Sequence, residues 1–212
     1  MAKKIKTAKI KNTVVLAPSF TDIAPVKTAI GKSKIALAAQ DMAPTNCGAY
    51  TGSVCGKDLK ELGVKYVILG HSERRKYFGE TYKMVNKKIK HAIEIGLVPV
   101  LCVGESSQEK KAGKTLGVVR SQLKTALEKI NTNNIIIAYE PIWAVGTGNP
   151  ENPQDANLVQ GEIKKQAGNV PVLYGGSVDS KNFAEFLAQE NIDGLLVGGA
   201  STKWEQFSKI IA

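Results

Sequence analysis

Long apolar runs and paired cysteines are missing from this sequence. No stretch approaches the roughly 18 consecutive apolar residues of a membrane span, and Met1–Lys4 leads into no apolar signal-peptide core. We therefore expect a cytosolic protein without membrane contact. The three cysteines are odd in number and lack C-x-x-C spacing, which predicts neither a disulfide framework nor a zinc site. We expect Cys47, Cys55 and Cys102 to be reduced thiols that mostly pack.

Arginine is scarce as well, although the formal net charge is +10. The arginines are Arg74, Arg75 and Arg120, and the remaining positive charge comes from lysines spread along the chain, with a denser patch at residues 3–11. Nucleic-acid readers depend on clustered arginine for bidentate contacts. The charge therefore indicates a solvated lysine surface rather than a nucleic-acid partner, and it is compatible with an anionic metabolite.

Short apolar runs alternate with segments of helical period throughout the chain. The runs lie at residues 13–17, 35–40, 66–70, 98–103, 135–139, 172–174 and 194–197. Each is apolar enough for a strand covered on both faces, and segments such as 83–95 and 118–130 supply crossover helices. This alternation predicts a parallel α/β sheet in one domain spanning residues 1–212. The pattern alone leaves an open doubly wound sheet and a closed barrel as alternatives.

Polar residues follow several of these predicted strands, and parallel α/β folds place their active sites at such carboxyl ends. Glu140 stands where a strand ends, and it can serve as a general base if burial raises its pKa. His71 begins the turn into a helix, whose positive end favours neutral imidazole as a hydrogen-bond donor. Each residue alone fits a helix cap or a packing role equally well. Their joint occurrence at successive strand ends favours one active site.

Glycine pairs add a second element to this predicted site. Gly175-Gly176 before Ser177, and Gly198-Gly199, place bare backbone N–H groups at strand-to-helix junctions. Such groups can cradle a dianion without a lysine side chain. Small residues after one large residue, at 143–148, suit a lid hinged at both ends. The combination points to a phosphorylated small molecule as substrate.

The order of these motifs resembles the triosephosphate isomerase family. The matching segments are 70–75, 101–105, 139–148, 174–178 and 196–201, within a resemblance that runs from about Val14 to the C-terminus. It implies a TIM (β/α) barrel that interconverts dihydroxyacetone phosphate and glyceraldehyde 3-phosphate without metal or organic cofactor. It also implies that Glu140 shuttles the proton, that His71 polarises the oxygens, and that Glu73 and Cys102 support them.

The resemblance further implies how the substrate is held. Backbone amides would bind its phosphate, at Gly146, Ser177, Gly198 and Gly199. A lid would close over the site and exclude water, so that the enediolate keeps its phosphate. The lid residues implied are Ile142, Trp143, Ala144, Val145, Gly146 and Thr147.

The family's first strand, which ends in an Asn-x-Lys motif, has no counterpart here. Residues 1–12 resemble the end of the first helix, and residues 13–212 supply strands two to eight. We therefore expect seven recognisable strands with the first βα unit largely missing. The absent lysine would face developing negative charge, and a preorganised donor at such a position is worth about 10²–10³ in rate. An isomerase with impaired activity is the expected function.

The resemblance also bears on partners. The loop Asp41–Gly56 is similar to the loop that family members insert into a partner subunit, where Thr51 would approach residues of the first strand. Together with two exposed sheet edges, this predicts a homodimer or other homo-oligomer. Two alternatives remain open: a catalytically silent barrel that binds phosphometabolites or serves in assembly, and a chain read from an internal methionine of a longer gene.

Overall fold

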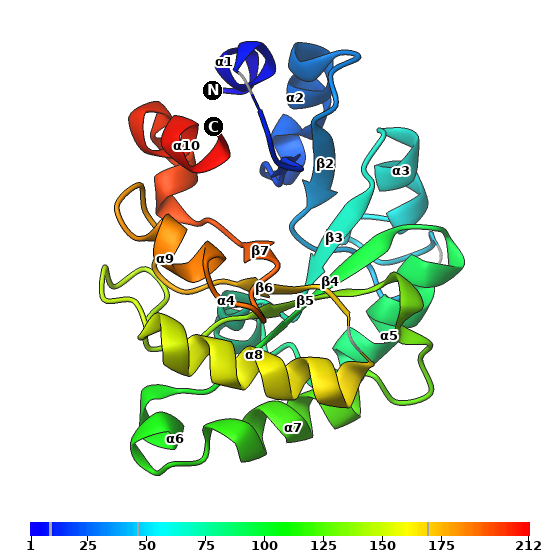
Figure 1. The fold of residues 1–212 in the computed structure, drawn as a ribbon. Coiled ribbons are helices and arrows are strands. Elements are labelled where there is room, and N and C mark those ends of the chain that lie inside the picture. Colours follow the sequence, from blue (N-terminus) through cyan, green and yellow to red (C-terminus); the bar gives the residue numbers. More distant parts are fainter. Residues whose placement is uncertain (9, 46, 169) are drawn as a thin grey trace.

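The computed structural model describes residues 1–212 apart from 9, 46 and 169. Residue 9 belongs to the predicted helix remnant and residue 46 to the 41–56 loop, so both predictions fall partly outside the described residues. The strands are β1 (Val15–Leu16), β2 (Ala36–Ala39), β3 (Tyr66–Leu69), β4 (Val98–Val103), β5 (Ile136–Tyr139), β6 (Val172–Tyr174) and β7 (Gly194–Leu195). All seven predicted strands are confirmed (Figure 1).

The strands form one parallel sheet in the sequential order β1 to β7. A doubly wound sheet reverses its strand order partway, whereas a sequential order keeps every crossover helix on one side. The order therefore decides between the two alternatives in favour of the barrel type. Within the described ranges, β1 and β7 pair with one neighbour each, so the curled sheet keeps two edges.

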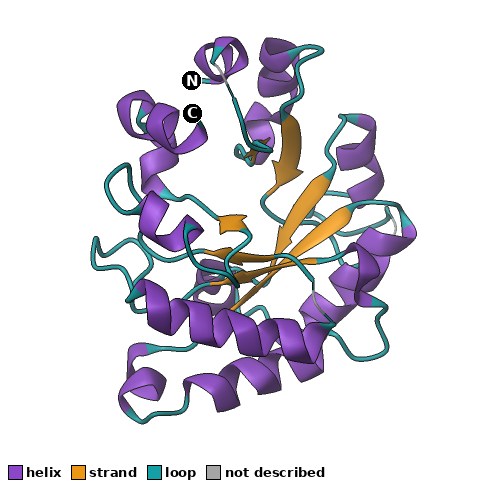
Figure 2. Cartoon of the chain, viewed as in Figure 1, coloured by secondary structure: helices purple, strands orange, loops and turns teal. Residues whose placement is uncertain are grey.

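Helices cover the outer side of this sheet (Figure 2). They are α1 (Ala2–Thr7), α2 (Ile23–Ile30), α3 (Gly56–Glu61), α4 (Ser72–Tyr77), α5 (Tyr82–Glu94), α6 (Ser107–Lys111), α7 (Thr115–Ala126), α8 (Pro153–Ala167), α9 (Phe183–Leu187) and α10 (Trp204–Ile211). Single 3₁₀ turns lie at η1 (Phe20–Asp22), η2 (Thr132–Asn134) and η3 (Gly199–Thr202). No helix among the described residues has the length and apolar character that crossing a membrane requires.

The two helices predicted in detail are present as α5 and α7. Helix α7 ends four residues earlier than the 118–130 pattern predicts, because its final carbonyls find another partner. The side-chain amide of Asn86 on α5 donates to the backbone oxygens of Ala126, at 2.9 Å, and Glu128, at 3.0 Å. Lys129 then adopts φ of 57°, which ends the helical path. The contact of Asn86 with the end of α7 thus sets this helix boundary, and the helical period of the sequence does not.

Side chains of the central strands alternate between two apolar layers, as the twofold strand period requires. Leu101 and Val103 of β4 face the helices, in a large cluster with Leu69 and Ile137. The other face of the same strand carries Val100 and Cys102 into a small inner cluster. Apolar residues at the rim of this inner layer are only partly buried: Ala17, Tyr66, Ile136, Leu173 and Leu196.

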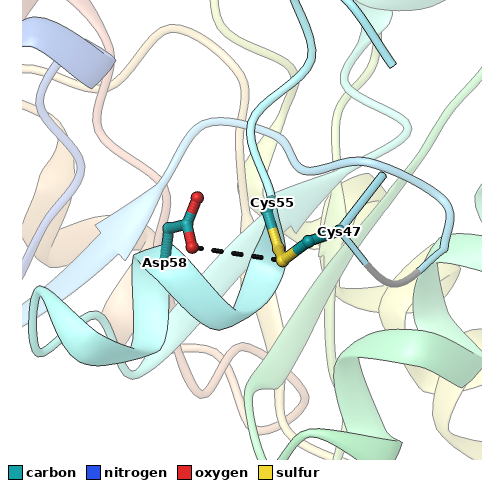
Figure 3. Close-up of side chains that lie close together, drawn as sticks. All are labelled: Cys47, Cys55 and Asp58. Carbon is teal, nitrogen blue, oxygen red and sulfur yellow. Dashed lines mark hydrogen bonds between the residues drawn. A yellow bond between two sulfur atoms is a disulfide. The ribbon is translucent and has the colours of Figure 1, made fainter. Parts of the chain in front are cut away.

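The prediction of three reduced cysteines is wrong for two of them. Cys47 and Cys55 form a disulfide with their Cα atoms 5.1 Å apart (Figure 3). The amide of Ala43 donates to the carbonyl of Val54 at 2.8 Å, so the arms of the loop run together and bring the two sulfur atoms into reach. Cys102 is free and buried, as predicted.

Candidate functional site

Glu140 lies directly after β5, held between its neighbouring strands. Its amide donates to the carbonyl of Val103 at 2.7 Å, and its side chain is buried. Two neighbouring residues are glycines, and the Cβ atoms that they lack would overlap with Glu140. A Cβ on Gly104 would lie 1.8 Å from the backbone oxygen of Glu140, and one on Gly175 would lie 2.8 Å from its Cγ. Both positions therefore require glycine for close approach.

His71 faces Glu140 across the ends of β3 and β5. Its Nε2 lies 3.2 Å from Oε1 of Glu140, and its Nδ1 accepts a hydrogen bond from the amide of Glu73 at 3.3 Å. Because Nδ1 accepts, it carries no proton, so the ring proton sits on Nε2 and points at the carboxylate. The amide of Ser72 donates to the other carboxylate oxygen at 3.3 Å. The geometry thus directs Nε2 of His71 at the carboxylate of Glu140 and Nδ1 at the backbone of Glu73.

Burial raises the pKa of two groups in this site, Glu140 and Cys102. Burial raises the pKa of Glu140 above its ordinary value, while His71, the amide of Ser72 and the thiol of Cys102 favour the carboxylate and oppose the shift. Burial and the nearby Glu140 carboxylate raise the pKa of Cys102 well above the usual range, so Cys102 is a thiol. The site therefore offers a carboxylate of increased basicity next to an N–H donor.

Glu73, which the resemblance places among the supporting residues, follows His71 by two positions. Its carboxylate is 68% exposed and lies 3.8 Å from Nδ1 of His71, beyond hydrogen-bond range. Its backbone amide is the group that contacts the imidazole. The hydrogen bond from Glu73 to His71 therefore comes from its backbone at the N-terminus of α4, and the exposed carboxylate lies near the ring without a hydrogen bond to it.

Ser177, Gly198 and Gly199 lie at neighbouring strand ends, and the fourth predicted phosphate-binding residue, Gly146, lies in the turns at 142–147. Ser177 follows β6, donates to the carbonyl of Ala144 at 2.6 Å and accepts from the amide of Gly148 at 3.1 Å. Gly198 and Gly199 follow β7, which pairs with β6, and both are exposed. Gly146 adopts φ of 71°, in the left-handed region. Ser177 is thus tied to the segment predicted as the lid.

That segment, residues 142–147, forms consecutive turns anchored at one large side chain. The indole N–H of Trp143 donates to Oε1 of Glu105 at 2.9 Å, and the carbonyl of Glu105 accepts from the amide of Ile142 at 3.0 Å. Glu105 is fully buried and also accepts from the hydroxyl of Tyr139 at 3.2 Å. In the sequence, Glu105 is recognised only as the last residue of a motif. Its contact with Trp143 could not be predicted, because it forms only when residues 142–147 are folded.

A Trp143→Phe substitution is expected to lower the free energy of unfolding by about 1.5–3 kcal/mol, because a buried carboxylate loses a hydrogen-bond donor. Denaturant unfolding measures this change. In a Glu105→Gln background the same substitution is expected to cost less, since the acceptor then carries no charge. Equal costs in both backgrounds would show that the indole contributes only by packing.

Comparison of this sequence with known proteins identifies the family to which the chain belongs. The family model for triosephosphate isomerase matches residues 1–212. A triosephosphate isomerase of Dehalococcoides mccartyi is 49% identical over 205 residues, covering 92% of this chain and 81% of the relative. One from a Thermoanaerobacter species is 47% identical over 220 residues, covering 98% and 88% respectively. One from a Synechococcus species is 48% identical over 200 residues, covering 93% and 80%. The chain belongs to the triosephosphate isomerase family.

Proposed function

We propose that this chain interconverts dihydroxyacetone phosphate and glyceraldehyde 3-phosphate. One observation supports this most: Oε1 of the buried Glu140 carboxylate, whose pKa burial raises, lies 3.2 Å from Nε2 of His71. Moving a proton between adjacent carbons needs a base for the carbon-bound proton and a donor for the neighbouring oxygen. The pair supplies both groups at the carboxyl ends of two strands.

In the proposed reaction, Glu140 removes the proton from the carbon beside the carbonyl and returns it to the former carbonyl carbon. The Nε2–H of His71 donates to each oxygen in turn as negative charge develops on it. The amides of Gly146, Ser177, Gly198 and Gly199 hold the phosphate. Closure of residues 142–147 excludes water and protects the enediolate.

We further propose that turnover by residues 1–212 is impaired, because these residues include no counterpart of the lysine that the resemblance assigns to the family's first strand. Among the hydrogen bonds and ion pairs of the described residues, none joins a lysine to Glu140 or His71. Losing one preorganised donor costs about 10²–10³ in rate. If the loss of rate is complete, the chain is a catalytically silent barrel that binds phosphometabolites.

A coupled isomerase assay in both directions tests the proposal. We expect slow turnover by the chain alone, and a gain of about 10²–10³ when a peptide carrying an Asn-x-Lys strand is added. The matched control is the same peptide with methionine in place of the lysine. No turnover with or without the peptide, despite binding of a phosphorylated enediolate analogue, would establish the silent barrel instead.

The proposal includes self-association and a cytosolic location. The tip of the 41–56 loop, residues 48–53, is exposed throughout and carries Tyr50 with 46% of its surface exposed. A projecting loop with an aromatic side chain is suited to insertion into a second copy. Sedimentation of the purified chain at several concentrations tests this part.

A further inference from the structure

The disulfide between Cys47 and Cys55 lies at the surface, unlike the buried thiol of Cys102. Cys47 is exposed, Cys55 is partly exposed, and the carboxylate of Asp58 lies 4.0 Å from the Cys47 sulfur (Figure 3). The bridge spans a sequence separation of only 8 residues. An accessible bridge that closes a short ring can be reduced without unfolding the domain.

The loop around this bridge has a firm base and a loosely held tip. At the base, Met42 and Ala43 are buried, and the Ala43–Val54 hydrogen bond joins the two arms. Gly56 is also buried, with the side chains of Met42 and Ile95 packed where its Cβ would lie. At the tip, the hydrogen bonds described run from Tyr50 to Gly48 and from Ser53 to Tyr50, within the tip itself. The disulfide is thus the covalent tie between tip and base.

We propose that Cys47 and Cys55 form a reversible redox latch that sets the order of the loop tip, residues 48–53. A low-molecular-weight thiol attacks the bridge, forms a mixed disulfide with one cysteine and releases the other as a thiol. A second external thiol then attacks the external sulfur of the mixed disulfide and releases the first cysteine. Two external thiols become one external disulfide, while the protein gains two electrons and two protons as two thiols. Reduction releases the tip and leaves the base of the loop in place.

A metal-holding role for the same residues is the competing interpretation. The two sulfurs and the Asp58 carboxylate lie within 4.8 Å of one another, as ligands of one cation would. Metal ligation requires thiolates, however, and each sulfur here is bonded to the other. The observed bond therefore favours the latch, and metal binding to the reduced form is an outcome that the experiment can detect.

Thiol counting tests the chemistry of the latch. After equilibration with glutathione disulfide and denaturation, we expect one titratable thiol per chain, from Cys102. After native treatment with dithiothreitol and its removal, we expect three. Three thiols after the oxidising treatment, or one after the reducing treatment, would overturn the proposal. Adding zinc chloride to the reduced chain should leave the two loop thiols reactive, and loss of their reactivity would favour the metal site.

Limited chymotrypsin digestion tests the consequence for the loop, independently of isomerase activity. It is carried out at a chain concentration where sedimentation shows the monomer, because a second copy seated on the loop would cover Tyr50. Cleavage after Tyr50 is expected to be at least tenfold faster in the reduced chain. In the oxidised chain the nicked fragments stay joined across the bridge, so they separate only on a gel run with reductant. Cleavage after Tyr77 or Phe78, which are 66% and 68% exposed outside the loop, serves as the internal reference.

A Cys47→Ser/Cys55→Ser double variant completes the test. It is expected to be cleaved after Tyr50 at the fast rate in both buffers, with cleavage after Tyr77 unchanged. Equal rates for the oxidised and reduced wild-type chain would show that the bridge does not order the tip.

Discussion

Replacing Glu140 with glutamine is expected to lower kcat for triose phosphate isomerisation by about 10²–10⁴-fold, the range typical of a lost general base. The glutamine amide matches the carboxylate in size and keeps the buried space between Gly104 and Gly175 filled. It can still accept a hydrogen bond from Nε2 of His71, so the imidazole keeps its partner. The coupled assay, with circular dichroism to confirm folding, measures the loss.

An exposed carboxylate outside the site provides the matched control. Glu190→Gln removes the same charge without altering the pocket, and its kcat is expected to stay within twofold of the parent. Unchanged turnover in Glu140→Gln would remove catalysis from this site altogether. A loss confined to KM would make Glu140 a binding group rather than the base.

The pH profile of kcat/KM gives a second reading of the same residue. The base acts only when ionised, and burial raises the pKa of Glu140 above its ordinary value of 4.5. Activity should therefore fall as the pH drops through that raised pKa. The fall should occur at a higher pH than it would for a solvated glutamate. The acid limb should be absent from whatever activity Glu140→Gln retains, because glutamine does not titrate.

The pairing of Glu140 with His71 could be predicted because strand ends in a parallel sheet share one edge. Strand β1 was predicted at residues 13–17 but covers only Val15–Leu16, since it pairs on one side alone, with Ala36 and Leu37 of β2. The Cys47–Cys55 bridge could not be predicted from spacing, because it depends on how the loop folds back. The same holds for Trp143 and Glu105, which meet only once the lid is folded.

A buried charge cluster around Asp41 could not be predicted from the sequence either. The ammonium of Lys88 on α5 lies 2.7 Å from Oδ1 and 2.9 Å from Oδ2 of Asp41, and it contacts the carboxylate of Glu80. Arg74, three residues after His71, contacts Asp41 at 2.8 Å. The side chains of Lys88, Asp41 and Glu80 are 5%, 11% and 2% exposed, so water compensates little of their charge.

A Lys88→Met substitution is expected to lower the free energy of unfolding by about 3–5 kcal/mol, because two buried carboxylates lose the more buried of their two shared cations and keep only Arg74. Methionine keeps most of the side-chain length, so the loss reports charge rather than a cavity. Lys87, the exposed neighbour on the same helix, is the matched control, and Lys87→Met is expected to change stability by no more than about 0.5 kcal/mol.

The pH dependence separates charge from packing in this variant. Burial already raises the pKa of Asp41, against the opposing effect of Lys88. Without Lys88 the pKa of native Asp41 rises further above that of the unfolded chain, so the loss of stability should grow as pH rises and shrink toward pH 4. A loss that stays constant with pH would mean that Lys88 acts through packing. Arg74 lies on α4, three residues after His71, and contacts Asp41. A loss of stability that depends on charge would therefore also mean that the cluster stabilises the turn that carries His71.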